Sequence, residues 1–139
     1  MTEKWIGSYV YGDAYPEAMK GSSIPFVIEW TINDGILTGT CVDDETKDYY
    51  TQPATIQGFI DNGVISFIKK YPCYCSTDDE GNITLDENRP AAEIHYSGMA
   101  VENHYEGEWE INMTFVDEYG MLQEYDWTGT WFLYKESEL

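Results

Sequence analysis

The sequence predicts an all-β fold: an eight-stranded antiparallel up-and-down barrel with a short helical turn after the first strand. Apolar and polar residues alternate with period two along much of the chain, as in strands with one buried face. Asp-Gly and Asn-Gly pairs separate successive segments and indicate tight hairpins. Glycine recurs within the expected strands, where it weakens a flat sheet but allows the bends of a barrel. These observations favour a barrel over the alternative, a two-sheet sandwich. The six glycines are Gly7, Gly39, Gly58, Gly98, Gly107 and Gly129.

Length and composition fit one β-barrel domain over residues 1–139. The chain has 139 residues, enough for one core and too few for two. Hydrophobic residues make up 42% of it, which excludes general disorder, and aromatic residues make up 16%, which suits strands.

The first three strands follow from alternation and turn chemistry. Pro16 suits the first position of a helical turn that ends before Gly21, after the first strand. Apolar residues alternate from Phe26 to Ile32, and the sequence Asn33-Asp34-Gly35 then predicts a hairpin. The expected segments are a strand at Lys4–Tyr11, the turn at 16–20, and strands at Phe26–Ile32 and Ile36–Val42.

Five more strands complete the predicted barrel. Asp61-Asn62-Gly63 marks a second hairpin, and Glu102-Asn103 marks a third turn. Alternation is clearest after Tyr105, where three glutamates share one face and large apolar residues share the other. The expected strands are Ala54–Ile60, Val64–Tyr71, Ala92–Val101, Tyr105–Phe115 and Met121–Lys135.

The charge of the chain restricts its partners. Seven basic and 26 acidic residues give a net charge of −19 and a pI of about 4.1. Such a field repels phosphate backbones and anionic headgroups, so we expect no nucleic acid and no membrane as partners. A charged partner is expected to be basic; alternatively, the carboxylates only keep the barrel soluble.

The cysteines predict no metal site. Cys41, Cys73 and Cys75 form one close pair and one distant thiol, whereas a structural zinc site needs four ligands. The N-terminal residues show no secretion signal and no stretch reads as a membrane span, so we expect a cytoplasmic protein with reduced thiols. The role of the three cysteines is left open.

Strand number, hairpin order, the helical turn and two Gly-x-Trp pairs give a resemblance to a known superfamily. The pairs are Gly107-Glu108-Trp109 and Gly129-Thr130-Trp131. On these features the chain resembles the calycins, the lipocalin, fatty-acid-binding and avidin-type barrels. Lipocalins carry Gly-x-Trp on their first strand, whereas this chain has the reversed Trp5-Ile6-Gly7 there and lacks an arginine on the last strand. The resemblance implies binding of a small molecule.

Large aromatic residues are expected to face the barrel interior. They either fill it, line a slot for a flat or greasy ligand, or lie on an outer face. For the second case, the predicted ligand-binding residues are Trp30, Phe67, Lys69, Tyr71, Tyr96, Trp109 and Trp131.

Lys69 is the predicted ligand-recognising charge. It shares a strand face with Phe67 and Tyr71, so it points inward if they do. A buried ammonium needs a partner, either an internal carboxylate or an anionic ligand group. Alternatively, Lys69 stands at the barrel mouth and its head reaches water.

No catalytic or metal motif is present, so the prediction is no enzyme, no cofactor and no metal. His95 alternates away from the interior, and His104 lies at a turn. Residues 76–87 overlap a calcium-loop pattern with Ser76 in place of the first aspartate, and an acidic hairpin tip explains them equally well.

The predicted function is therefore non-enzymatic binding of a small apolar or aromatic ligand in the barrel interior. The alternative is an acidic protein-interaction module, such as an immunity-like inhibitor, whose carboxylates at Glu106, Glu108 and Glu110 bind a basic partner.

Overall fold

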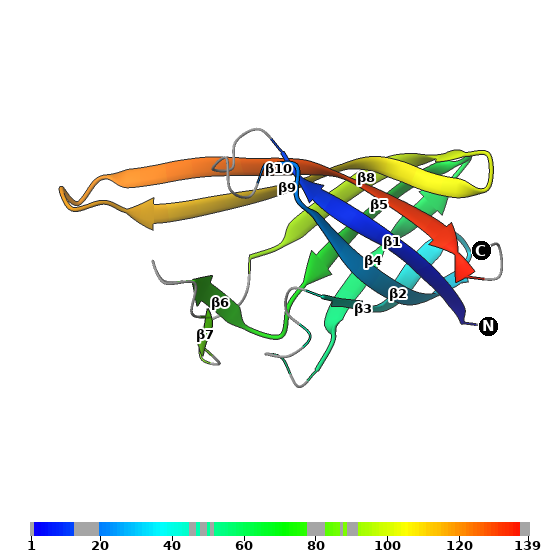
Figure 1. Cartoon of the computed structure of the whole chain (residues 1–139), viewed down its shortest axis with the longest axis horizontal. Helices are drawn as coiled ribbons and strands as arrows, with labels where there is room; N and C mark the ends of the chain where they lie inside the picture. Colours follow the sequence, from blue (N-terminus) through cyan, green and yellow to red (C-terminus); the bar gives the residue numbers. More distant parts are fainter. Residues whose placement is uncertain are drawn as a thin grey trace.

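Eight strands close into one antiparallel barrel, in the order β1-β10-β9-β8-β5-β4-β3-β2. The structure is a computed structural model that describes residues 2–12, 20–44, 47, 50, 52–77, 83–86, 88 and 92–136. Figure 1 shows the strands wrapping around a common axis. The barrel strands are β1 (Glu3–Tyr11), β2 (Ser23–Asn33), β3 (Ile36–Asp43), β4 (Ala54–Asp61), β5 (Val64–Lys70), β8 (Ile94–Val101), β9 (His104–Val116) and β10 (Leu122–Lys135).

Closure depends on β1, which pairs with both β2 and β10. Trp5 lies opposite Ile28 on one side and Lys135 on the other. The predicted barrel is confirmed and the two-sheet sandwich is excluded. All eight expected strands are present, with ends that differ from the prediction by a few residues.

The two ends of the barrel differ in their connections. At the short-turn end, β2–β3, β4–β5 and β8–β9 are joined by tight hairpins. Asp34 and Gly35 both have positive φ (53° and 80°), as do Asn62 and Gly63 (52° and 81°), which confirms the predicted turns. At the loop end lie the longer connections β1–β2, β3–β4 and β5–β8.

A small separate sheet lies in the β5–β8 connection. It consists of β6 (Tyr74–Thr77) and β7 (Ile83–Asp86), which pair antiparallel. The sequence did not predict these strands; the end of β6 and all of β7 fall within residues 76–87, the segment considered as a calcium loop. Residues 78–82 and 87 of that segment lie outside the described residues, as do residues 16–19 of the expected helical turn.

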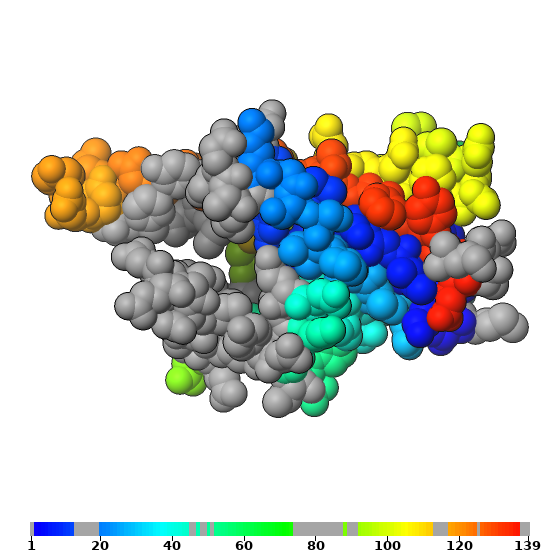
Figure 2. All heavy atoms as spheres, in the orientation of Figure 1, coloured from blue at the N-terminus to red at the C-terminus, as the bar shows by residue number. Residues whose placement is uncertain are grey.

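The β9–β10 hairpin continues past the loop end. Pairing of β8 with β9 stops at Ile111, whereas β9 and β10 remain paired as far as Val116 and Leu122. We call residues 112–126 the arm; Figure 2 shows its tip, in orange, extending beyond the rest of the molecule. Asn112 links its strands, since its amide donates to Glu124 (2.8 Å) and Asp126 (2.6 Å).

Two glycines make room for tryptophan rings in the core. A Cβ atom on Gly129 would lie 2.3 Å from Nε1 of Trp109, and one on Gly98 would lie 2.9 Å from Cζ2 of Trp131. The indoles therefore occupy space that any larger residue at these positions would fill. This close packing is the physical reason for two of the glycines that predicted the barrel.

Candidate ligand-binding site at the loop end

A buried ion pair lies inside the barrel near its loop end. Asp43 ends β3 and Lys69 lies on β5, two strands away. Nζ of Lys69 is 2.9 Å from Oδ2 of Asp43, and each residue is 1% exposed. The hydroxyl of Tyr71 donates to the same oxygen at 2.5 Å. One carboxylate oxygen thus accepts from an ammonium and a phenol.

Aromatic rings surround the ammonium group. Its nitrogen lies 4.7 Å from the ring centroid of Tyr71, 4.9 Å from that of Tyr9 and 5.8 Å from that of Phe26. The negative ring faces attract a cation, and more strongly where water is excluded. Lys69 is therefore held by one carboxylate and three rings.

Burial and charge shift the pKa values of the groups around the ion pair. Burial by itself lowers the pKa of Lys69, but interactions within the cluster, including the ion pair with Asp43, outweigh it and raise the pKa well above its usual value. Burial raises the pKa of the Cys41 thiol to about 11. Burial likewise raises the pKa values of Tyr71 and Tyr96.

A pocket of about 150 Å³ adjoins the ion pair. Its lining residues include Cys41 and Ala54 from barrel strands and Tyr71, which directly follows β5. The β3–β4 connection contributes Lys47, Tyr50 and Gln52. The rings of Tyr50 and Tyr71 are stacked, with centroids 5.2 Å apart. The Tyr50 hydroxyl donates to the backbone oxygen of Cys73 at 2.7 Å, which ties this connection to the one after β5.

The structure divides the predicted site residues between two levels. Phe67, Tyr96 and Trp131 are buried and contact one another at mid-barrel, with Phe67 and Tyr96 stacked at 4.7 Å, and Trp30 contacts Phe67 from the short-turn end. Trp109 is buried beside Tyr9 and Tyr11. Tyr71 lines the loop-end pocket, and Lys69 lies behind it.

The buried indole groups donate to the protein itself. Trp109 donates to Val10 O (3.1 Å), and Trp131 lies within hydrogen-bond distance of Ser97 O (3.2 Å) and Glu108 O (3.0 Å). Trp30 donates to Oε1 of Glu3 at 2.9 Å. With their donors used and their rings in contact, these tryptophans act as core residues in this structure.

Among the alternatives left open for Lys69, the structure shows pairing with an internal carboxylate. The alternative in which its head reaches water at the barrel mouth is wrong, because the side chain is 1% exposed. The sequence did not predict the partner, Asp43, although Leu37, Cys41 and Asp43 lie on the same face of β3 and all three are buried. It also missed Tyr50, which lies in a connection without periodicity.

The other candidate groups lie apart from this site. His95 is exposed, as predicted, and His104 contacts Glu106 at 3.1 Å on the outer face. Cys41 and Cys73 are buried free thiols. Within the described part of the chain, no three His, Cys, Asp or Glu residues are placed to hold a metal ion, and no helix is long and apolar enough to cross a membrane.

Comparison with known proteins finds a similarity to a solved structure. The chain is similar to the crystal structure of rhizavidin, with a TM-score of 0.45 and 12% sequence identity, over 95% of this chain and 81% of that one. No protein-family model and no curated protein matches the sequence. The closed eight-stranded up-and-down barrel has the architecture that the sequence predicted. It defines a fold, and folds of this kind host many functions.

Proposed function

We propose that this protein is a non-enzymatic barrel that binds a small aromatic or apolar molecule at its loop end. One observation carries the proposal: a buried ion pair lies directly behind a pocket whose walls, Cys41 and Tyr71, contact it. A buried ion pair is weak evidence for stability, since apolar residues of similar volume often serve as well. Perturbed titratable groups beside a pocket are typical of binding sites.

The pocket sets the size and chemistry of the ligand. A cavity of about 150 Å³ is large enough for a single benzene ring. The Tyr50 and Tyr71 rings offer an aromatic wall, and the Tyr71 hydroxyl offers a polar contact. The proposed ligand is one ring or a short apolar chain carrying one polar group.

The chemistry of the cluster supports binding over catalysis. The thiolate is the nucleophilic form of cysteine, and a Cys41 pKa of about 11 keeps the thiol protonated at neutral pH. Neither His95 nor His104 belongs to the cluster. The two buried free thiols also support a cytoplasmic location, where thiols stay reduced.

A calorimetric screen tests this proposal. Phenol, benzoate, indole, a short fatty acid and haem are titrated into the wild-type protein and into Ala54→Phe and Gln52→Trp, which fill the pocket. We expect at least one single-ring compound or short chain to bind wild type, and both variants to reduce its affinity at least tenfold. Gln52 is exposed, so its variant tests the pocket even if Ala54→Phe unfolds.

Tyr71→Phe and Tyr105→Phe form a matched pair. Both remove a phenol oxygen, but Tyr105 packs at the short-turn end, against Trp5 and Trp30. We expect only Tyr71→Phe to lower the affinity for the compound, by about tenfold for the loss of one polar contact. Failure of every compound to bind, or equal binding to the filled variants, would overturn the proposal.

A further inference from the structure

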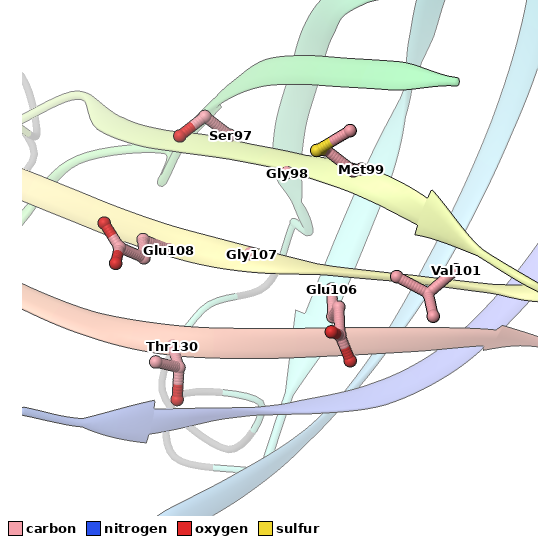
Figure 3. Close-up of a pocket in the computed structure, with 8 residues that line it drawn as sticks. All are labelled: Ser97, Gly98, Met99, Val101, Glu106, Gly107, Glu108 and Thr130. Carbon is pink, nitrogen blue, oxygen red and sulfur yellow. The ribbon is translucent and has the colours of Figure 1, made fainter.

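A groove crosses the outer face of β8, β9 and β10, away from the loop-end pocket. It is an open depression of about 650 Å³, and Figure 3 shows its lining residues on the three strands. Met99 lies opposite Glu106, and Glu108 lies opposite Thr130. The groove is independent of the proposed ligand site.

A pair of glycines forms the floor of the groove. Gly98 and Gly107 are register partners on β8 and β9. A Cβ atom on Gly107 would lie 1.9 Å from the Ser97 oxygen, so the two backbones approach more closely than any other residue permits. The absence of side chains at this level lets Trp131 pack beneath Gly98 on the inner face.

The rim of the groove combines apolar and acidic side chains. Met99 is 60% exposed and Val101 38%, and Val64 lies opposite Met99 with 43% exposed. Glu106 and Glu108 project from β9 between these residues and β10 (Figure 3). Glu110 continues the same face of β9 toward the arm.

Basic groups within the chain do not neutralise these carboxylates. Residues 94–134 contain no lysine or arginine. Glu106 contacts His104 at 3.1 Å, whereas no ion pair involves Glu108 or Glu110 among the described residues. The groove is therefore apolar along β8 and negative along β9.

We propose that this groove binds an extended segment of a partner protein in which lysine or arginine alternates with uncharged residues. Carboxylates at positions i, i+2 and i+4 of β9 repeat about every 6.8 Å, the same spacing as side chains on one face of an extended peptide. The aliphatic stems of such basic residues cover Met99 and Val101 while their heads reach the carboxylates.

The negative charge of the groove favours a basic segment over two other possible occupants. A second copy of the chain would bring another net charge of −19 to an already negative face. Nucleic acid carries the same sign as the groove. A basic extended segment is complementary in charge, in apolar contact and in spacing.

Fluorescence anisotropy with two labelled peptides tests the proposal. Lys-Thr-Lys-Thr-Lys-Thr presents its three lysines on one face of an extended chain, and Lys-Lys-Lys-Thr-Thr-Thr has the same charge but divides them between two faces. We expect the alternating peptide to bind wild type at least threefold more tightly at low salt. Affinity is expected to fall as salt is added.

Matched variants separate the groove from the general field of the molecule. Glu106→Gln/Glu108→Gln/Glu110→Gln is expected to weaken the alternating peptide about tenfold, as for three exposed ion pairs. The control Glu29→Gln/Asp34→Asn/Asp61→Asn removes the same charge from exposed positions elsewhere and is expected to change binding less than about twofold.

Three outcomes would overturn the proposal. They are equal loss in the two triple variants, no preference between the peptides, and a dimer in sedimentation that disappears with Met99→Ser while neither peptide binds. Loss of groove binding with intact binding of a single-ring compound leaves the loop-end site standing, so the two proposals fail separately.

Discussion

The two ends of the barrel are closed by different kinds of interaction. At the short-turn end, Trp5, Trp30 and Tyr105 pack with ring centroids 5.2–6.3 Å apart. Glu3, at the barrel rim, accepts from both indoles and pairs with Lys135. At the loop end the charges lie inside the barrel, where Asp43 and Lys69 are sealed from water.

The two carboxylates differ in how they are satisfied. Burial by itself raises the pKa of Glu3, but hydrogen bonds from Trp30, Lys135 and Trp5 outweigh it and lower the pKa. That carboxylate keeps contact with water while it satisfies buried donors. Asp43 and Lys69 have lost their hydration and must satisfy each other, which gives a stability gain only with good geometry. Closing an end does not require such a pair.

Breaking the buried pair should have the largest effect. Asp43→Ala leaves the Lys69 ammonium without its carboxylate, and we expect the free energy of unfolding to fall by about 3–5 kcal/mol. Asp43→Asn/Lys69→Met removes both charges and should recover most of this loss. Urea unfolding followed by tryptophan fluorescence measures both. A loss below about 1 kcal/mol in Asp43→Ala would mean that Lys69 is not dependent on Asp43.

Alkaline pH should destabilise the loop end next. The Cys41 pKa rises from 9.0 to about 11 on folding, so above pH 9 the unfolded chain releases this proton first and the folded state loses stability. The full shift corresponds to roughly 2–3 kcal/mol by pH 11. The raised pKa values of Lys69, Tyr71 and Tyr96 act in the same direction.

Cys41→Ala isolates the cysteine contribution. Its stability relative to wild type, measured by urea unfolding at pH 7, 9, 10 and 11, should improve steadily as the pH rises. Parallel curves for the two proteins would assign the alkaline loss to other groups.

A smaller effect is expected for Trp30→Phe at the short-turn end. The variant keeps an aromatic ring but loses the donor to Glu3, a charge-assisted bond of about 2 kcal/mol. The same substitution in a Glu3→Gln background gives a double-mutant cycle that separates the hydrogen bond from the change in ring size. A coupling energy of zero would mean that the hydrogen bond between Trp30 and Glu3 does not stabilise the short-turn end.

The smallest effect is expected for Glu3→Gln alone. An amide oxygen still accepts from Trp30, so at neutral pH the variant should lose less than about 1 kcal/mol, as for exposed ion pairs. Because folding lowers the Glu3 pKa, wild type loses this contribution as the pH falls below about 4.5, whereas the variant does not. Thermal melting at pH 7 and pH 3 measures the difference; an equal shift for both proteins would contradict it.

Local patterns predicted the barrel strands because period two and turn residues act over a few positions. Two hairpins were predicted from three residues each, and the positive φ values at Asp34, Gly35, Asn62 and Gly63 confirm them. β6 and β7 were not predicted because strands of four residues show too little alternation to be distinguished from a loop.

The site was predicted only in part, for a physical reason. Alternation placed Lys69 inside, but its partner depends on which strands meet across the barrel interior. Asp43 lies two strands away, and no sequence spacing encodes that distance. Alternation also placed Trp30 and Trp131 inside without showing whether their rings would touch one another or line a slot.

The pairing of β1 with β10 has a consequence for how the molecule assembles. The seam joins segments from opposite ends of the chain, such as Trp5 and Lys135, and contacts of this kind form slowly. Until the seam closes, the sheet has two unpaired edges, which are templates for aggregation. Like charges repel, so we expect the net charge of −19 to limit association of such intermediates while this aromatic-rich barrel folds.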